Sequence, residues 1–213
     1  MRRLFSGTPT AFRLLVIGAH PDDIEIGCGG TILRLVGEGR VAEVGWVVLS
    51  GTHDRRAEAR NAAARIVGVT ASRVILHEFR DGFLPHHGVE VKEAFEALKD
   101  FAPDLILTHR REDLHQDHAF VGAVTWQTFR DHTILEYEVP KWDGDLATPN
   151  LYVELTEALI SEKVRVLASS FGSQTGRHWF NDETFRGLAR IRGIECRAAD
   201  GYAEGFQARK VVW

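Results

Sequence analysis

Residues 14–25 read LLVIGAHPDDIE, an apolar run followed directly by a histidine, a proline and three acidic residues. The run is typical of a buried β-strand, which we place at residues 13–18. A helical pattern follows at residues 30–38 and ends at Gly39. A buried strand, a polar turn and a helix, in this order, form the unit from which parallel sheets are built.

The same unit recurs along the first 130 residues. Strand-like runs lie at residues 41–49, 73–77 and 104–108, and helical patterns lie at residues 55–67, 89–100 and 117–130. Repeats of this length predict an α/β fold, Rossmann-like, with a mainly parallel sheet and helices on both faces.

The pattern is less regular after residue 131. It indicates short strands at residues 137–140 and 151–155, helices at 156–169 and 182–192, and a last edge strand at 207–212. Thr156 is the expected N-cap of the first of these helices. Because the sequence contains neither an internal repeat nor a low-complexity linker, we expect residues 1–213 to form a single domain.

Composition narrows the class of protein. Hydrophobic residues make up 44% of the chain and the net charge is −4, so the sequence has no basic footprint for nucleic acid. Two cysteines without Cys-x-x-Cys spacing argue against a disulfide framework or a thiolate metal site. The sequence shows neither a signal peptide nor an apolar run long enough for a membrane span, so we expect a cytoplasmic protein.

Two polar clusters follow apolar strands. The first holds His20, Asp22 and Asp23, and the second holds His115, Asp117 and His118. Ligands bind beyond the carboxyl ends of parallel strands, so the two clusters should meet at one edge of the sheet. Nitrogen and oxygen ligands of this kind suit Zn²⁺ with one position open for water, although Fe²⁺ or Co²⁺ could take its place. The pattern therefore predicts a metal-dependent hydrolase.

The clusters also belong to longer motifs. AHPDD at residues 19–23, GGT at 29–31 and HQDH at 115–118 resemble the signature motifs of the PIG-L/LmbE-like zinc-dependent N-acetylglucosaminyl deacetylases. RRAEAR at residues 55–60 and YAEGF at 202–206 are similar to further segments of that family. The resemblance implies a small amino-sugar conjugate as substrate, hydrolysis of its N-acetyl group, and a homo-oligomer, either a trimer or a hexamer.

The resemblance also implies a role for each motif residue. His20, Asp23 and His118 would bind the metal, and Asp22 would be the general base. His115 would stabilise the oxyanion and protonate the leaving amine, and Asp117 would orient His115. Arg55 would contact the substrate.

Alternatives to these assignments remain open. Arg55 could equally form a solvated pair with Glu58, three residues further on a helix. The same metal site could hydrolyse a different amide or an ester. A Rossmann-like nucleotide-binding module is less favoured, because acidic residues fill the turn where a phosphate would bind. Phe171 stands where many members of the family have a histidine, and Gly205 stands where they have an alanine.

Overall fold

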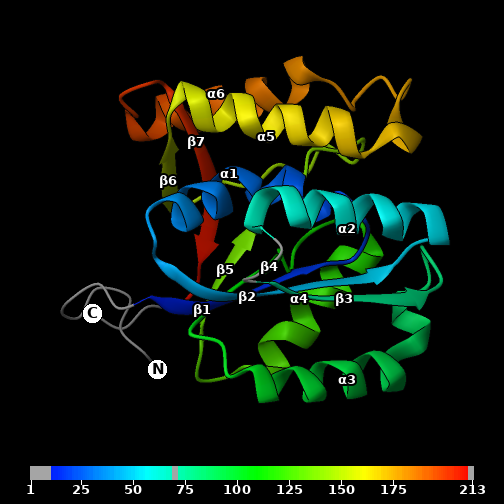
Figure 1. The fold of residues 1–213 in the computed structure, drawn as a ribbon. Coiled ribbons are helices and arrows are strands. Elements are labelled where there is room, and N and C mark those ends of the chain that lie inside the picture. Colours follow the sequence, from blue (N-terminus) through cyan, green and yellow to red (C-terminus); the bar gives the residue numbers. More distant parts are fainter. Residues whose placement is uncertain (1–10, 69–71, 211–213) are drawn as a thin grey trace.

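The computed structural model describes residues 11–68 and 72–210. Its centre is a seven-stranded sheet with the order β3-β2-β1-β4-β5-β7-β6 (Figure 1). The strands are β1 Phe12–Gly18, β2 Val41–Ser50, β3 Ser72–Phe79, β4 Leu105–His109, β5 Thr133–Tyr137, β6 Leu151–Leu155 and β7 Tyr202–Ala208. The first five strands run parallel to one another, and β7 runs antiparallel to both β5 and β6.

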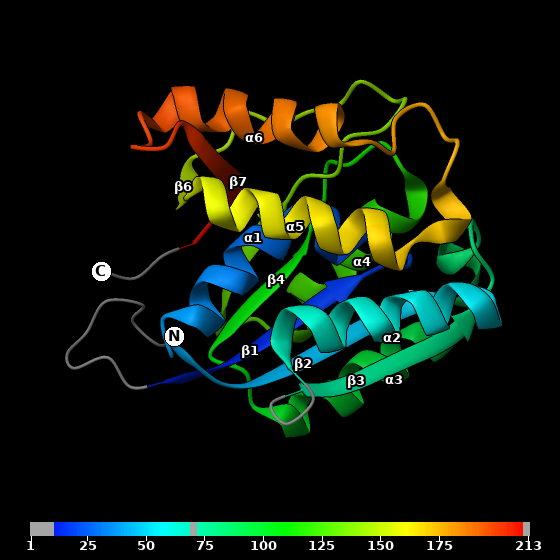
Figure 2. The same cartoon turned by 45° about the horizontal axis from the view of Figure 1, so that its top comes forward.

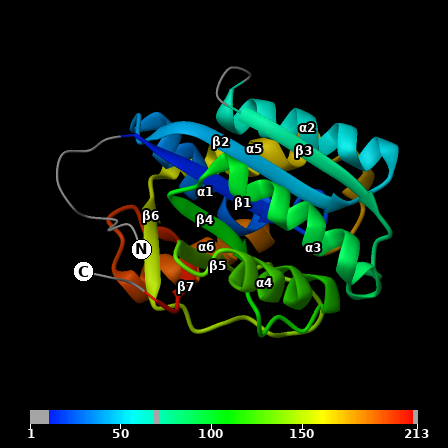
Figure 3. The same ribbon diagram turned by 90° about the horizontal axis from the view of Figure 1, so that it is seen from below.

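Helices cover both faces of this sheet, which confirms the predicted fold class. They are α1 Asp23–Gly37, α2 His53–Val67, α3 Gly88–Ala97, α4 Gln116–Thr128, α5 Glu157–Ser170 and α6 Asp182–Cys196. Helices α1, α2 and α5 lie on one face and α6 packs beside α5, as Figure 2 shows. Helices α3 and α4 cover the opposite face (Figure 3).

The central strand β1 explains why this arrangement forms. Leu14 and Val16 belong to the core under α1, α2 and α5. Leu15 and Ile17 belong to the core under α3 and α4. Because side chains alternate between the faces of a strand, an uninterrupted apolar run buries both of its faces only when the sheet is covered on both sides.

The C-terminal third departs from the sequence-based expectation in two strands. The strand predicted at residues 137–140 is β5, Thr133–Tyr137, and it lies earlier in the chain. The predicted edge strand at 207–212 is β7, Tyr202–Ala208, which lies inside the sheet between β5 and β6. Residues 211 and 212 lie outside the described residues. The edge strands of the described sheet are β3 and β6.

Several helix boundaries also differ. The helix predicted at residues 89–100 ends at Ala97 and continues as a 3₁₀ turn, Leu98–Phe101. The helix predicted at 182–192 extends to Cys196. Thr156 caps α5 as expected, because its side chain accepts a hydrogen bond from the N–H of Leu159.

Helix α1 begins at Asp23 rather than at residue 30, so it starts inside the acidic turn. Its glycine-rich segment is helical but kinked at Cys28, where φ is −146° and ψ is 15°. The Glu204 carboxylate accepts hydrogen bonds from the N–H groups of Gly30 and Thr31, at 2.9 and 2.6 Å, and thereby caps the second half of the helix. These bonds satisfy backbone groups that the kink would otherwise leave unpaired.

A buried lysine completes this arrangement. Lys163 on α5 donates hydrogen bonds to the Ile26 carbonyl at 2.6 Å and to Glu204 Oε1 at 2.7 Å. The buried Lys163–Glu204 pair therefore links α5 and β7 to the kink of α1. Glu204 of the YAEGF motif thus has a structural role, because it accepts hydrogen bonds from the backbone of α1 and pairs with Lys163 of α5.

Gly27, just before the kink, should tolerate no side chain. A Cβ atom there would lie 2.2 Å from Cδ2 of the buried Tyr137 ring. We expect Gly27→Ala to lower the free energy of unfolding by about 1–3 kcal/mol, the usual cost of overpacking a core. Chemical denaturation followed by circular dichroism measures this change.

Gly37→Ala is the matched control, because a Cβ atom at that position meets no atom within 4 Å. We expect its stability to be unchanged or raised by less than about 1 kcal/mol, since alanine favours helix over glycine. Equal stability of the two variants would contradict the tight contact between Gly27 and Tyr137.

Candidate metal and catalytic site

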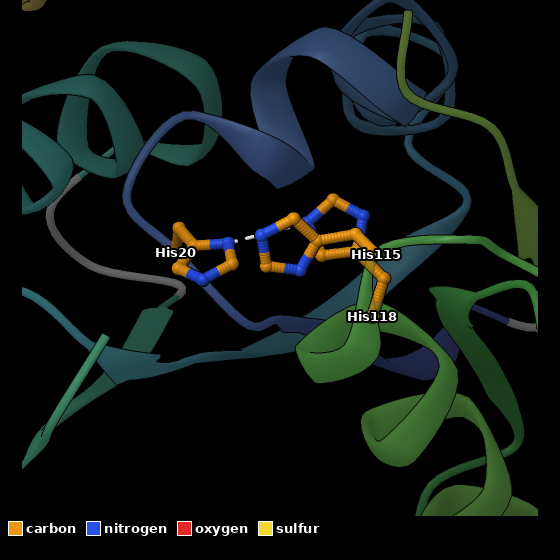
Figure 4. Close-up of side chains that lie close together, drawn as sticks. All are labelled: His20, His115 and His118. Carbon is orange, nitrogen blue, oxygen red and sulfur yellow. Dashed lines mark hydrogen bonds between the residues drawn. The ribbon is translucent and has the colours of Figure 1, made fainter. Parts of the chain in front are cut away.

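The pairing of β1 with β4 brings the two polar clusters together. The two strands run parallel, with Leu14 beside Leu105 and Val16 beside Leu107. His20 follows the end of β1, and His118 lies in the first turn of α4. Figure 4 shows the rings of His20, His115 and His118 gathered at this edge.

Three predicted ligands form a compact triangle. His20 Nδ1 lies 3.2 Å from His118 Nε2 and 3.3 Å from Asp23 Oδ2, and His118 Nε2 lies 3.4 Å from Asp23 Oδ1. Ligand atoms bound tetrahedrally at about 2.0–2.1 Å from Zn²⁺ are themselves roughly 3.3 Å apart. The donor set and its spacing therefore fit a divalent ion of this kind.

The electrostatics of the triangle favour positive charge. Burial alone would lower the pKa of His20 and His118, but the Asp23 carboxylate beside them raises both pKa values above their ordinary range. Burial would likewise raise the pKa of Asp23, yet the histidines around it, led by His118, hold that pKa well below its usual value. A buried pocket that stabilises a cation in this way suits a metal.

Asp22, the direct neighbour of Asp23, has a different charged partner, Arg55. Its backbone has φ 97° at the N-cap position of α1, a conformation that aspartate tolerates better than most residues. Burial raises the pKa of Asp22 to about 7, although Arg55, whose Nη2 lies 3.1 Å from Asp22 Oδ2, acts in the opposite direction. A carboxyl group that titrates near neutral pH is suited to act as a general base.

His115 lies against both histidines of the triangle. Its ring meets that of His20 edge-on at 4.9 Å and stacks on that of His118 at 4.5 Å. Burial, followed by the charges of His118 and His20, lowers the pKa of His115. Its Nδ1 accepts a hydrogen bond from the backbone N–H of Asp117, so the neutral ring carries its proton on Nε2.

The carboxylate of Asp117 does not make the expected contact. It lies 3.1 Å from His20 Nε2 and accepts hydrogen bonds from the N–H groups of Gly82 and Leu84. Asp117 therefore orients His20, not His115. The reason is geometric, because Asp117 is in the first turn of α4 and faces the loop after β3.

Arg55 forms the pair with Glu58 that the helix spacing suggests, and it also contacts Ser173 and Asp22. Its guanidinium lies 3.3 Å from Glu58 Oε2, 3.1 Å from Ser173 Oγ and 3.1 Å from Asp22 Oδ2. Its side chain is 17% exposed, so the pair with Glu58 is not a solvated one. The buried Phe171 ring lies under the guanidinium at 5.6 Å, which gives this departure from the family pattern a packing role.

Three further residues belong to the site, although the sequence analysis does not assign them to it. His109 Nε2 lies 3.0 Å from Asp23 Oδ2, and Asp113 Oδ2 lies 3.3 Å from His118 Nδ1. Asp81 Oδ1 lies 3.1 Å from His20 Nε2. Their signal in the sequence is position: His109 ends β4, Asp113 is in the loop after it, and Asp81 follows β3.

Comparison with known proteins places the chain in a family. The profile of the PIG-L family, described as GlcNAc-PI de-N-acetylase, matches residues 15–129. The uncharacterized deacetylase YaiS of Escherichia coli K12 is 31% identical over 170 residues, which cover 72% of this chain and 88% of YaiS. The chain belongs to the PIG-L family, and hence to a family of deacetylases.

Solved structures share its fold. An N,N'-diacetylchitobiose deacetylase from Pyrococcus horikoshii superposes with a TM-score of 0.71 and 23% identity, over 92% of this chain and 83% of that one. GalB, a 4-carboxy-2-hydroxymuconate hydratase from Pseudomonas putida KT2440, superposes with a TM-score of 0.77 and 17% identity, over 95% of this chain and 98% of GalB. One fold thus carries both a deacetylase and a hydratase, so the reaction depends on the site. In residues 11–68 and 72–210, every helix is too short or too polar to cross a membrane.

His118→Ala should remove the metal. Losing one of three protein ligands leaves two donors, so we expect metal content to fall from about one ion per chain to near zero after dialysis. Elemental analysis measures the content, and circular dichroism checks that the variant is folded.

The control is His53→Ala, which changes a histidine at the start of α2 whose side chain is 90% exposed. This variant should keep its metal. Full occupancy in folded His118→Ala protein would exclude His118 as a ligand.

Proposed function

We propose that the protein is a metal-dependent N-deacetylase that hydrolyses the N-acetyl group of a small N-acetylglucosamine-type conjugate with an activated water molecule. The observation that carries this proposal is the triangle of His20, Asp23 and His118, with the buried Asp22 beside it. Membership of a deacetylase family supports the choice of an amide as the bond that is cleaved.

His20, Asp23 and His118 would hold the ion. Zn²⁺ is the expected ion for this donor set, and Fe²⁺ or Co²⁺ can use the same ligands. When bound, a divalent ion supplies Lewis acidity to a water molecule and to the amide carbonyl. Asp117 would support metal binding by orienting His20. It accepts a hydrogen bond from His20 Nε2 and so leaves the Nδ1 lone pair directed at the triangle.

Asp22 is the proposed general base. Its carboxylate accepts a proton from the attacking water, and a pKa of about 7 leaves a substantial fraction of the group ionised near neutral pH. Arg55 holds this carboxylate in place through the contact between its Nη2 and Asp22 Oδ2. Arg55 is also the proposed substrate contact on this side of the site.

His115 is the proposed group on the opposite side of the reacting carbonyl. In its neutral form the Nε2–H donates a hydrogen bond to the oxygen on which negative charge develops. The proton that Asp22 accepts from the water would then pass to the leaving amine, which would otherwise depart as an unstable anion.

Two alternatives are less well supported. Hydrolysis of another amide or an ester needs the same residues, so substrate tests must separate it from deacetylation. Nucleotide binding is disfavoured because the turn after β1 presents the buried carboxyl groups of Asp22 and Asp23 where a phosphate would bind. A single domain over residues 1–213, a cytoplasmic location and a trimeric or hexameric assembly remain predictions.

The function is tested with metal-loaded protein and a panel of N-acetylglucosaminides, with acetate release as the readout. We expect acetate from at least one amino sugar and none from the same protein after treatment with a chelator. Hydrolysis of simple esters or unrelated amides without acetate release from any sugar would favour the alternative hydrolase.

Asp22→Asn should separate catalysis from metal binding. The amide keeps the size of the side chain but cannot accept the proton, so we expect kcat to fall by about 10²–10⁴-fold with unchanged metal content. Asp54→Asn, at an exposed position in the first turn of α2, is the control and should keep full activity. Loss of metal from Asp22→Asn would mean that the roles of Asp22 and Asp23 are exchanged.

A further inference from the structure

An exposed tryptophan lies on a turn of the β5–β6 connection, residues 141–145, which we call the Trp142 turn. Lys141 Nζ and Asp145 Oδ1 close its base at 2.6 Å, and Gly144 has φ +66°. Trp142 is 69% exposed. Its indole lies nearly coplanar with the ring of His178 in the α5–α6 connection, with centroids 5.7 Å apart and planes at 18°, and its N–H donates to His178 Nε2 at 3.1 Å.

The Trp142 turn borders the candidate site. Lys141 Nζ lies 3.0 Å from Asp113 Oδ1, and the other oxygen of Asp113 lies 3.3 Å from His118 Nδ1. Asp145 accepts a hydrogen bond from the N–H of Leu114, the residue directly before His115. The loops that carry the turn and His178 lie on the same side of the molecule (Figure 2).

Leu114 adds a second exposed apolar side chain at this border. It is 66% exposed, although its backbone is fixed by the hydrogen bond to Asp145. Leu114 and Trp142 are thus presented to solvent by two neighbouring loops that Asp145 holds together. Fixed apolar side chains beside a reacting centre are typical of ligand-binding sites.

The charges of the turn select the kind of ligand. Its cation, Lys141, is paired with both Asp113 and Asp145, and Arg110 is paired with Asp145. These cations are already neutralised by carboxylates, so the turn offers a phosphate no unpaired positive charge of its own. The surface that remains is the exposed face of the Trp142 indole, which His178 holds at its N–H edge. Such a face binds planar, uncharged groups best.

We propose that Trp142 and Leu114 form a subsite for the aglycone of the substrate, and that this aglycone is an uncharged apolar ring. The proposal rests on the proposed deacetylase function and specifies its substrate class. Because the indole is held by its N–H bond to His178, little conformational entropy is lost when a ring packs on it. Two side chains are too few for a stable interface between copies, which needs roughly 800 Å² on each partner.

The test compares the phenyl and methyl β-glycosides of N-acetylglucosamine. The two glycosides carry the same acetamide on C2 and differ only in the aglycone on C1, so a difference in kcat/KM reports aglycone binding. We expect the wild-type protein to prefer the phenyl glycoside by about tenfold, the order of one aromatic contact with its buried area. Trp142→Ala should reduce this ratio to near one and leave kcat/KM for the methyl glycoside within twofold.

Ile194→Ala is the matched control, because it removes an exposed apolar side chain from α6. It should preserve the preference. His178→Ala should lower the ratio only in part, since the indole keeps its position in the turn but loses its support. An unchanged ratio in Trp142→Ala, or an equal loss for both glycosides, would overturn the proposal.

Calorimetric binding of the two glycosides to the same proteins separates this inference from the function on which it rests. Binding of the phenyl glycoside that depends on Trp142, without acetate release, would refute the deacetylase function and preserve the subsite. Sedimentation velocity covers the remaining outcome. A change of oligomeric state in Trp142→Ala, with an unchanged glycoside ratio, would assign the surface to contacts between copies and refute the subsite.

Discussion

The parallel pairing of β1 with β4 is the constraint on which the rest of the structure depends. His20 and His118 are 98 positions apart in the chain, yet their nitrogens lie 3.2 Å apart because both follow strands that end at the same edge. The pairing is secured by the apolar residues of β1, which are buried on both faces of the sheet. Core packing therefore sets the geometry of the site, because it fixes the strand ends that the polar residues follow.

This position has an electrostatic cost that the surrounding residues offset. Buried carboxyl groups and imidazoles lose hydration, and for Asp23 the histidines around it offset this cost. The left-handed backbone at Asp22 directs two adjacent carboxyl groups to different partners. Asp23 contacts the imidazoles and Asp22 contacts Arg55, so one turn supplies two carboxyl groups with different surroundings.

Much of this could be predicted from the sequence, because long apolar runs and strand-end motifs are local signals. Strand β5 was misplaced because its buried Glu136 makes it look like a polar segment. The partners of Glu136 are Trp126, ten residues before it, and Arg209, 73 residues after it. The start of α1 was misplaced because a glycine-rich stretch argues against a helix. Glu204, which caps the second half of α1, is more than 170 residues away from Gly30 and Thr31. Contacts of this range have no signature in a local pattern.

The position of Asp117 shows how such a contact changes a chemical role. The HQDH motif suggests that the acid supports its neighbour His115, but the loop after β3 supplies two N–H groups that turn the carboxylate toward His20. With a proton held on Nε2, the lone pair of His20 is left on Nδ1, the atom that faces His118 and Asp23. Asp117 thus contacts His20 through its carboxylate, whereas its backbone N–H donates to Nδ1 of His115. Since one fold carries both a deacetylase and a hydratase, the fold by itself does not define the reaction, and contacts of individual side chains such as this one must be established separately.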